Sequence, residues 1–314
     1  MSRIIRVFPS RTVATPTDEL AYVDRGPGLP IPEADEVHIS VSFTWDLPRA
    51  EQLKKLWKSV APVKIGGPAT GQRGEEFIPG KYLRPGYTIT SRGCPNRCAH
   101  CTVWKRDGPV RELPIKVGSN VQDDNLLACS DKHIKAVFRM LKRQTDPVRF
   151  GGGLEAKLLQ EWHVEELTKL NLLSVFFAYD TPDDHEPLVE TGKMLARAGI
   201  IKPYTHVAKC YVLIGMPRDD FDLADDRMIQ TMQAGFMPYP MLFRGPKDGK
   251  EKSHSWKEFR KRWAGNFSMM STLLEGKRKV LWDSIGWKPR KYVRVKPTKG
   301  DLQQAEIEDF WNNL

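Results

Sequence analysis

Three cysteines lie close together in the sequence, in a spacing that suits an inorganic cofactor. The segment Thr90-Ser-Arg-Gly-Cys94-Pro-Asn-Arg-Cys98-Ala-His-Cys101 separates them as C-x3-C-x2-C. One loop of this length can place three thiolates around a single centre, and cysteine thiolates, usually four, hold iron–sulfur clusters. Three leave one iron of a cubane open, and an open metal position is typical of a reactive site. The spacing therefore predicts a [4Fe–4S] cluster with an accessible iron, held by Cys94, Cys98 and Cys101.

Other uses of these thiols fit the sequence less well. A structural zinc site would need a fourth ligand, for which His100 and His133 are candidates, and it usually has paired C-x2-C knuckles. Disulfides are rare in cytosolic proteins of this size. The 5 cysteines of the whole chain are also too few and too clustered for a secreted disulfide scaffold.

The cysteine loop follows a β-like run, and similar runs alternate with helical patterns after it. Strands are expected at Tyr87–Thr90, Val117–Gln122, Pro147–Phe150, Leu173–Tyr179, Val207–Ile214 and Met237–Phe243. Helices are expected at Lys132–Arg143, Leu154–Leu170, Pro187–Ala198 and Leu223–Ala234. Such alternation predicts an α/β fold with a parallel sheet and right-handed crossovers. Parallel sheets carry their active sites at the carboxyl ends of the strands, so the residues that follow each strand are the candidates.

A C-x3-C-x2-C loop after the first strand of a repeated β/α unit resembles the radical S-adenosylmethionine (radical SAM) superfamily. The flanking Thr-Ser-Arg-Gly-Cys-Pro-Asn-Arg-Cys is most similar to its cobalamin-binding and methylthiotransferase branches. The segments Asp-Asn-Leu-Leu-Ala-Cys, Gly-Gly-Leu-Glu-Ala-Lys-Leu-Leu and Phe-Ala-Tyr-Asp-Thr-Pro resemble compact radical SAM proteins that phages often encode.

The resemblance implies a partial (β/α)6 barrel over Tyr87–Phe243 whose [4Fe–4S] cluster binds SAM at the open iron. An electron from an external donor of the flavodoxin or ferredoxin type would then cleave SAM into methionine and a 5′-deoxyadenosyl radical. That radical would abstract a hydrogen from the substrate, while the protein positions the cofactors and excludes quenchers.

The same resemblance implies SAM contacts after several strands. His100 takes the place near the adenine. Asp123-Asp124 stands where many relatives have Gly-Gly-Glu, and its carboxylates would accept hydrogen bonds from the SAM ammonium. After the third strand, Lys157 would pair with the SAM carboxylate and Glu155 is a further candidate contact. As an alternative, Asp123-Asp124 forms a solvated turn before a helix.

Two later strands complete the expected cofactor site. Asp180 would hold the ribose hydroxyls, and Gly215 would let the adenine lie against the backbone. On the strand expected at Val207–Ile214 and shortly after it, Tyr211 and Arg218 stand where relatives usually have a glycine and a glutamate. Cys129, near the barrel mouth, is a candidate catalytic hydrogen donor or methyl carrier, although a structural role is the plainer interpretation.

The chain divides into three expected regions: a truncated Rossmann-like α/β region at 1–80, the radical SAM barrel at 81–243 and a basic helical extension at 244–314. In the first, strands are expected at Ile4–Phe8, Val37–Phe43 and Val63–Gly66, with a helix at Pro48–Val60. The Asp-x-His-x-x-Gly motif that ligates cobalamin is absent, because His38 has neither an aspartate two residues before it nor a glycine three residues after it. No cobalamin is therefore expected.

Positive charge is concentrated in the last region. The chain has a net charge of +10, and residues 244–299 hold 17 Lys and Arg against 5 Asp and Glu. Such a segment suggests an acidic partner, of which nucleic acid is the commonest, although a solvated basic helix that aids solubility is the alternative. An aromatic stripe in the same region is interpreted as docking onto the core. The stripe comprises Trp256, Phe259, Trp263 and Phe267, and the basic clusters comprise Arg260, Lys261, Arg262, Lys277, Arg278, Lys279, Arg290, Lys291 and Arg294.

Composition excludes several broad classes. A chain of 314 residues that is 40% hydrophobic can bury a core, so it is not disordered as a whole. No apolar run has the length of a membrane span, and the charged start does not fit a signal peptide, so a cytoplasmic protein without a membrane partner is expected. Three functions stay open: a radical SAM enzyme acting on nucleic acid or a nucleotide, one acting on a small molecule or peptide, and a nucleic-acid-binding module with a structural metal.

Overall fold

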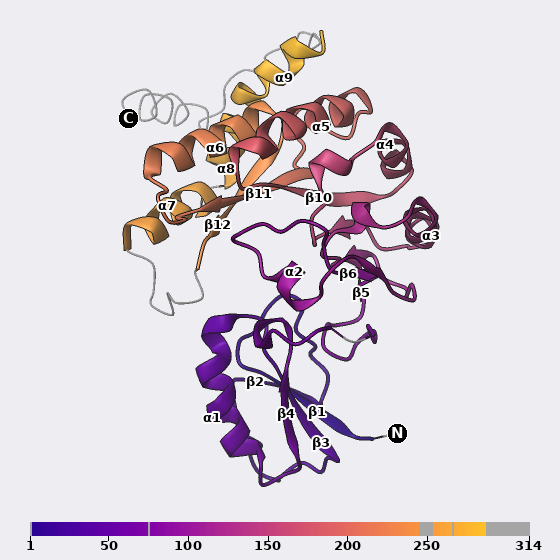
Figure 1. Cartoon of the computed structure of the whole chain (residues 1–314), viewed down its shortest axis with the longest axis vertical. Coiled ribbons are helices and arrows are strands. Elements are labelled where there is room, and N and C mark those ends of the chain that lie inside the picture. The colour runs from indigo at the N-terminus through magenta and orange to yellow at the C-terminus, as the bar shows by residue number, and fades with distance from the viewer. Residues whose placement is uncertain (1, 75, 245–253, 266, 287–314) are drawn as a thin grey trace, which may run out of the picture.

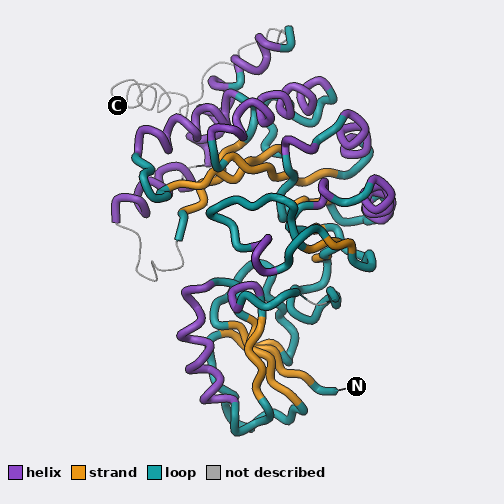
Figure 2. Tube along the Cα trace, in the orientation of Figure 1, coloured by secondary structure: helices purple, strands orange, loops and turns teal. Residues whose placement is uncertain are grey.

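The computed structural model of the chain describes residues 2–74, 76–244, 254–265 and 267–286. In this part the chain folds around two separate parallel sheets (Figures 1 and 2). No helix in the described part combines the length and the apolar character that a membrane crossing requires.

The smaller sheet has four strands in the order β2-β1-β3-β4. Its elements are β1 (Ile4–Phe8), β2 (Ala21–Val23), β3 (Glu36–Ser40), α1 (Leu47–Trp57) and β4 (Val63–Gly66), all strand pairs being parallel. The apolar face of α1 packs Leu53 and Trp57 against the alternating buried residues of β1 and β3. The sequence predicted β1 and β4 correctly and missed β2. The buried residues of this unit form a hydrophobic core separate from that of the larger sheet.

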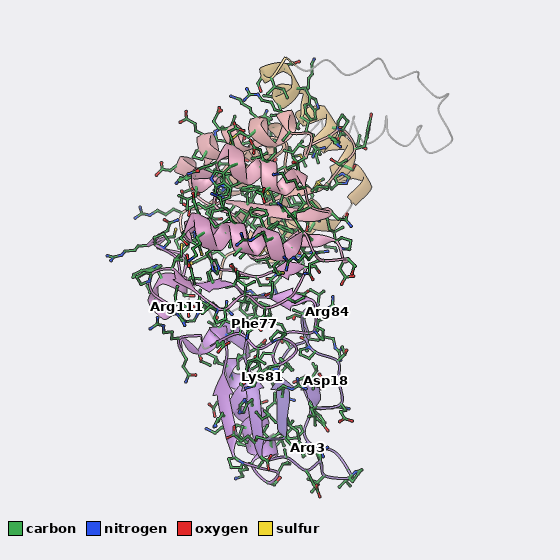
Figure 3. All side chains as sticks on the ribbon, turned by 90° about the vertical axis from the view of Figure 1, so that its right-hand side faces the viewer. Arg3, Asp18, Phe77, Lys81, Arg84 and Arg111 are labelled. Atoms are coloured by element: carbon green, nitrogen blue, oxygen red, sulfur yellow. The ribbon has the colours of Figure 1, made fainter. Side chains whose placement is uncertain are left out.

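The linking segment between the sheets is tied to both. Arg6 of β1 donates to the carbonyl oxygens of Gly80 and Lys81, both at 3.0 Å. Arg111 donates to the Gly74 oxygen at 2.7 Å. The labelled side chains of Lys81, Arg84 and Arg111 lie in the zone between the two sheets (Figure 3). These contacts tie the linking segment to the smaller sheet and to Arg111, which follows the cysteine loop.

The larger sheet has six strands in the order β12-β11-β10-β9-β8-β5, and every pair is parallel. The strands are β5 (Tyr87–Thr88), β8 (Asn120–Val121), β9 (Val148–Phe150), β10 (Leu172–Tyr179), β11 (Ala208–Ile214) and β12 (Met237–Leu242). Spatial order follows chain order, so each crossover adds its strand on the same side. The expected α/β fold with a parallel sheet is confirmed.

The crossover helices lie on one side of this sheet (Figure 1). They are α3 (Asp131–Leu141), α4 (Glu161–Thr168), α5 (His185–Arg197) and α6 (Phe221–Gln233). The short helix α2 (Val103–Arg106), which follows the cysteine loop, lies on the opposite side (Figure 1). A two-stranded antiparallel pair, β6 (Ser91–Arg92) with β7 (Arg111–Glu112), closes the base of that loop.

One helix differs from the expected one. The sequence predicted a continuous helix over 154–170, but the chain forms a short 3-10 turn at Ala156–Leu158 and then α4. Leu159 and Gln160 between them are extended, and Gln160 and His163 form a reciprocal capping box that starts α4 afresh. The break leaves the residues after β9 in a loop beside the cysteines.

Three helices form the described part of the C-terminal extension: α7 (His254–Gly265), α8 (Phe267–Lys277) and α9 (Lys279–Ser284). Phe259 and Trp263 are buried in the main core, and Trp263 Nε1 donates to Asp225 at 2.8 Å. The docking role of the aromatic stripe is confirmed for these two residues.

The expected basic surface at residues 277–279 is wrong for Arg278, which is fully buried. Its guanidinium donates to the carbonyl oxygens of Gly235, Lys202 and Thr205 and pairs with Glu275 at 2.7 Å. Arg278 therefore anchors the extension to the core rather than facing a polyanion. Arg290, Lys291 and Arg294 lie outside the described residues.

Candidate metal and cofactor site

The three clustered cysteines lie on the loop that leaves the first strand of the larger sheet. Cys98 is exposed, whereas Cys94 and Cys101 are partly buried, and none forms a disulfide. Burial raises the pKa of Cys98 and of Cys101, and the charges of neighbouring cysteines raise both further: Cys101 and Cys94 act on Cys98, and Cys94 acts on Cys101. Within the described residues, however, no three His, Cys, Asp or Glu side chains are gathered tightly enough to hold a metal ion as they stand.

The loop turns sharply just before the first cysteine. Gly93 has φ of +89°, and a Cβ there would lie 2.3 Å from the Pro109 carbonyl oxygen. Only glycine fits this close approach. The Cys94 N–H then donates to Gly108 O at 3.1 Å, and the Cys101 N–H to Cys98 O at 3.1 Å. The backbone of the loop is thus fixed at both ends of the motif.

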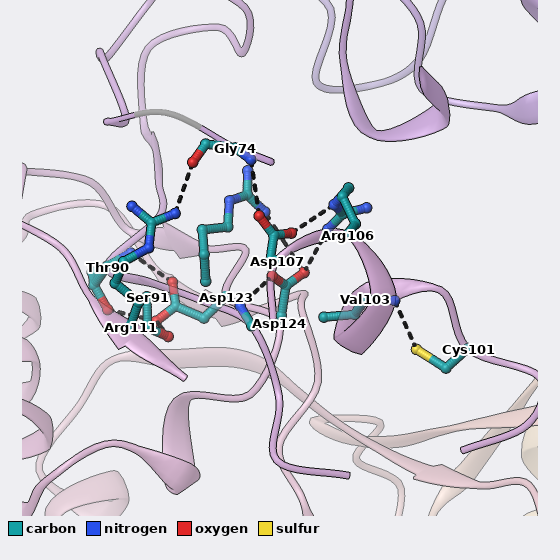
Figure 4. A network of polar contacts seen from close by, with 12 residues as sticks. Gly74, Thr90, Ser91, Cys101, Val103, Arg106, Asp107, Arg111, Asp123 and Asp124 are labelled. Carbon is teal, nitrogen blue, oxygen red and sulfur yellow. Dashed lines mark hydrogen bonds and ion pairs between the residues drawn. The ribbon is translucent and has the colours of Figure 1, made fainter. Parts of the chain in front are cut away.

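Asp123 holds the strand that leads into the loop (Figure 4). It is 2% exposed and accepts from Thr90 N at 2.6 Å, from the Thr90 hydroxyl at 2.6 Å and from the Ser91 hydroxyl at 2.8 Å. Burial raises the pKa of Asp123, while these hydrogen bonds oppose the shift. All three donors belong to the chain, so the Asp123 carboxylate positions the segment that enters the cysteine loop.

Asp124 holds the next part of the loop. It accepts from Gly93 N at 2.9 Å and lies 3.3 Å from Arg106 Nη2 and 3.7 Å from Arg92 Nη1. Arg106 also pairs with Asp107 at 2.6 Å, and the other Asp107 oxygen accepts from Gly74 N (Figure 4). The carboxylates after β8 and on α2 therefore form one network with the loop's arginines.

Residues after β8 and β9 meet at Cys94. Asn125 Nδ2 lies 3.4 Å from Cys94 Sγ and donates to Glu155 at 2.6 Å. Asn96, inside the cysteine motif, donates to the other Glu155 oxygen at 2.8 Å. Asn125 Oδ1 is buried and makes no hydrogen bond within the described residues. An unsatisfied buried acceptor beside a candidate metal ligand can take a hydrogen from a bound donor.

A further contact joins the cysteine segment to the end of β10. His100 Nε2 lies 3.2 Å from Asp180 Oδ2, and the hydrogen bond with Asp180 raises the pKa of His100. Lys157 pairs instead with Asp184 at 3.0 Å, and the Asp180 N–H donates to the same Asp184 carboxylate at 3.1 Å. Of the predicted residues, Asp124, Glu155 and Asp180 contact the cysteine segment, which includes His100. Lys157 contacts Asp184, which is bonded to Asp180.

Two glycines serve packing: Gly152, in the turn after β9, and Gly215, which was predicted to contact the adenine. A Cβ on Gly152 would lie 2.1 Å from the Asp123 carbonyl oxygen, so the turn after β9 fits against the end of β8 only as glycine. At Gly215, a Cβ would meet Leu242 and Trp256 at 3.1 and 3.2 Å. That side of Gly215 therefore faces β12 and α7.

Cys129 lies beside the network but is not activated. Burial raises the pKa of Cys129 to about 11, and a contact with the Ser91 hydroxyl lowers it only in part. Its sulfur packs against the main core. Cys210 is fully buried. At neutral pH both are thiols, which favours a structural role.

Alkylation of the metal-free protein should separate these thiols. At pH 8 a thiol with pKa near 11 is about 0.1% thiolate, so Cys129 should react with iodoacetamide about 200-fold more slowly than free cysteine. Its rate should rise about tenfold per pH unit up to pH 11, and Cys98 should be labelled first. Peptide mass spectrometry reports each site, with Cys210 as a buried control. Equal labelling of Cys98 and Cys129 would contradict this assignment.

Several residues of the network were not singled out from the sequence. Asn96, Arg106 and Asp107 lie inside or directly after the cysteine motif, and Asn125 follows the Asp123-Asp124 pair. Their position near the motif was the only available signal. Apart from the pairing of Arg106 with the adjacent Asp107, their partners lie 18 to 59 residues away in the chain.

Neither a known family model nor a curated protein matches this sequence.

Proposed function

We propose that this chain is a radical SAM enzyme that binds a [4Fe–4S] cluster through Cys94, Cys98 and Cys101 and acts on a nucleic acid or nucleotide. One observation carries the proposal: a C-x3-C-x2-C loop leaves the first strand of a parallel sheet and is held by side chains from the ends of the next three strands. Residues from β8, β9 and β10 contact it through Asp124, Glu155 and Asp180.

The arrangement of the larger sheet supports a partial (β/α)6 barrel. Six parallel strands follow one another in chain order, and the crossover helices lie on one side. A sheet wound in this single direction leaves its other side available for ligands, in contrast to a doubly wound sheet with helices on both faces. The cysteine loop lies on that side, as a barrel-interior site requires.

The donor set fits the cluster by type. Three thiols on one loop, without a fourth cysteine nearby, suit a cubane that keeps one iron open. When bound, the cluster would supply the electron that splits SAM into methionine and a 5′-deoxyadenosyl radical. Burial and the charges of neighbouring cysteines raise the pKa values of Cys98 and Cys101, and a bound cation would stabilise the thiolates together.

The chain's own residues would orient the cofactors. Asn125 Oδ1 is free to accept from the SAM amino group, since its Nδ2 is already committed to Glu155 and Cys94. His100 is held by Asp180, so its ring can support the adenine. The exposed Cys98 edge would receive an electron from a partner of the flavodoxin or ferredoxin type.

Anaerobic reconstitution with iron and sulfide tests the proposal. The protein should turn brown, bind about four irons per chain and release 5′-deoxyadenosine slowly when dithionite and SAM are added. SAM should perturb the spectrum of the reduced cluster. A colourless protein that holds one zinc per chain after the same treatment would overturn the proposal in favour of a structural-metal module.

The class of substrate needs its own test. Nucleic acid that copurifies with the anaerobic protein should contain an altered nucleoside after digestion, when SAM and reductant are supplied. If only a small molecule or a peptide is modified, the cofactor chemistry stands and the nucleic-acid assignment falls.

A further inference from the structure

The two faces of the larger sheet differ in what they expose. On β11 the side chains of Ala208, Cys210, Val212 and Ile214 are at most 1% exposed, whereas the alternate residues Lys209, Tyr211 and Leu213 are partly exposed. The buried set faces the crossover helices. The second face, which we call the open face, carries Arg149, Phe176, Lys209, Tyr211 and Tyr239 from β9, β10, β11 and β12.

Three aromatic rings pack together on the open face, where Phe176 is buried, Tyr211 is partly exposed and Tyr239 is exposed. Phe176 and Tyr211 stack with centroids 4.5 Å apart and an interplanar angle of 16°. Tyr239 stands edge-on to both, 5.8 Å from Tyr211 and 6.2 Å from Phe176. The Tyr211 hydroxyl donates to Gly151 O at 2.9 Å, which locks its ring. Tyr239 is 50% exposed, and its hydroxyl makes no hydrogen bond within the described residues.

Two cations lie beside these rings without an acidic partner. Lys209 Nζ lies 5.5 Å from the Phe176 ring centroid. Burial and the nearby charge of Arg149 lower the pKa of Lys209. No carboxylate of the described residues pairs with either side chain. Partly buried like charges without a counter-ion favour binding of an anion.

A pocket extends this charge toward the start of the strands. Its volume is about 230 Å³, and its lining includes Arg84, Arg149, Asn120 and Tyr87, with Asp146 as the one carboxylate. Arg84 lies between the two sheets (Figure 3). Three cations, Arg84, Arg149 and Lys209, thus run from the pocket to the aromatic surface.

We propose that the open face binds single-stranded nucleic acid, with a base stacked on Tyr239 and phosphates held by Lys209, Arg149 and Arg84. A ring face next to unpaired cations matches the base–phosphate alternation of a single strand, whereas the bases of a duplex are stacked on one another and do not reach a ring on a sheet. Naming this strand as the substrate rests on the proposed function; the binding itself does not require the cluster.

Fluorescence anisotropy with a labelled 20-nucleotide single strand tests the proposal on the full chain. Tyr239→Ala should weaken binding about 5- to 150-fold, because stacking of one base is lost, while Tyr239→Phe should retain affinity. Lys209→Met should reduce the slope of log affinity against log salt by about 0.7. Lys193→Met changes a lysine of α5, on the helix-covered side of the sheet, and should have no effect.

Several outcomes would overturn the assignment. Binding by the wild type that is unchanged in the Tyr239 and Lys209 variants would place the interface elsewhere, on the C-terminal extension first. Equal affinity for an acidic peptide, a duplex or a single nucleotide would remove the single-strand assignment, as would no binding at low salt. If reconstitution gives no iron–sulfur cluster but Tyr239-dependent binding persists, the proposed function fails and the open face stands.

Discussion

Replacing Cys94, Cys98 and Cys101 together with alanine should abolish iron and acid-labile sulfide binding after anaerobic reconstitution. In the proposed cluster each of these thiolates would bind one iron, and the other two cysteines are poorly placed to substitute. Cys129 packs against the core with a pKa of about 11, and Cys210 is fully buried. Iron and sulfide analysis of the purified variant measures the loss, which should be complete rather than partial.

The matched control is Cys129→Ala, which should bind iron like the wild type. The triple variant should also keep its fold, because the three sulfurs make only weak contacts with Asn125 and Val103. We expect its unfolding free energy to change by no more than about 1 kcal/mol in the metal-free state. Iron retained by the triple variant, or lost equally from Cys129→Ala, would place the metal site elsewhere.

Local patterns in the sequence were sufficient to predict that strands and helices alternate. They were also sufficient to predict that the candidate site residues lie close together. His100, Asp124, Glu155 and Asp180 were selected because each lies in the motif or follows a strand, and parallel strands bring their carboxyl ends to one edge. In the structure these residues contact the cysteine segment. Their positions after successive parallel strands were enough to predict that they share one edge of the sheet.

The partners of those residues were beyond local patterns. Asp123 and Asp124 looked equally suited to an exposed ligand contact, yet Asp123 bonds to Thr90 and Ser91, which lie 32 to 33 residues earlier. Whether a polar side chain finds its hydrogen-bond partners within the protein depends on long-range packing, which the periodicity of the sequence does not show. Arg278 is the same case, because its three carbonyl partners lie 43 to 76 residues away. The strand β2 was missed since three residues carry no periodic signal.

The role of Asp123 leads to the second large effect. Asp123→Ala should leave the Thr90 N–H and two hydroxyl groups without partners in a buried site. Unsatisfied buried donors cost roughly 1–3 kcal/mol each, and relaxation reduces the sum, so we expect a loss of about 3–5 kcal/mol in unfolding free energy. Urea denaturation of the metal-free protein measures it. Iron loading should fall as well, because Thr90 and Ser91 fix the entry to the cysteine loop.

Asp123→Asn separates positioning from direct cofactor binding. The amide oxygen can still accept from the Thr90 N–H, and its NH2 can donate to a hydroxyl that turns to accept, so stability should fall by only about 1 kcal/mol. Iron loading and SAM affinity should then stay near those of the wild type. If Asp123 instead held the SAM ammonium, the asparagine variant would fold and bind iron normally but lose SAM affinity about 10- to 100-fold, since a charge-assisted hydrogen bond would be gone. Isothermal titration of the reconstituted variant with SAM distinguishes the two roles, because only the second predicts a large loss of affinity without a loss of stability.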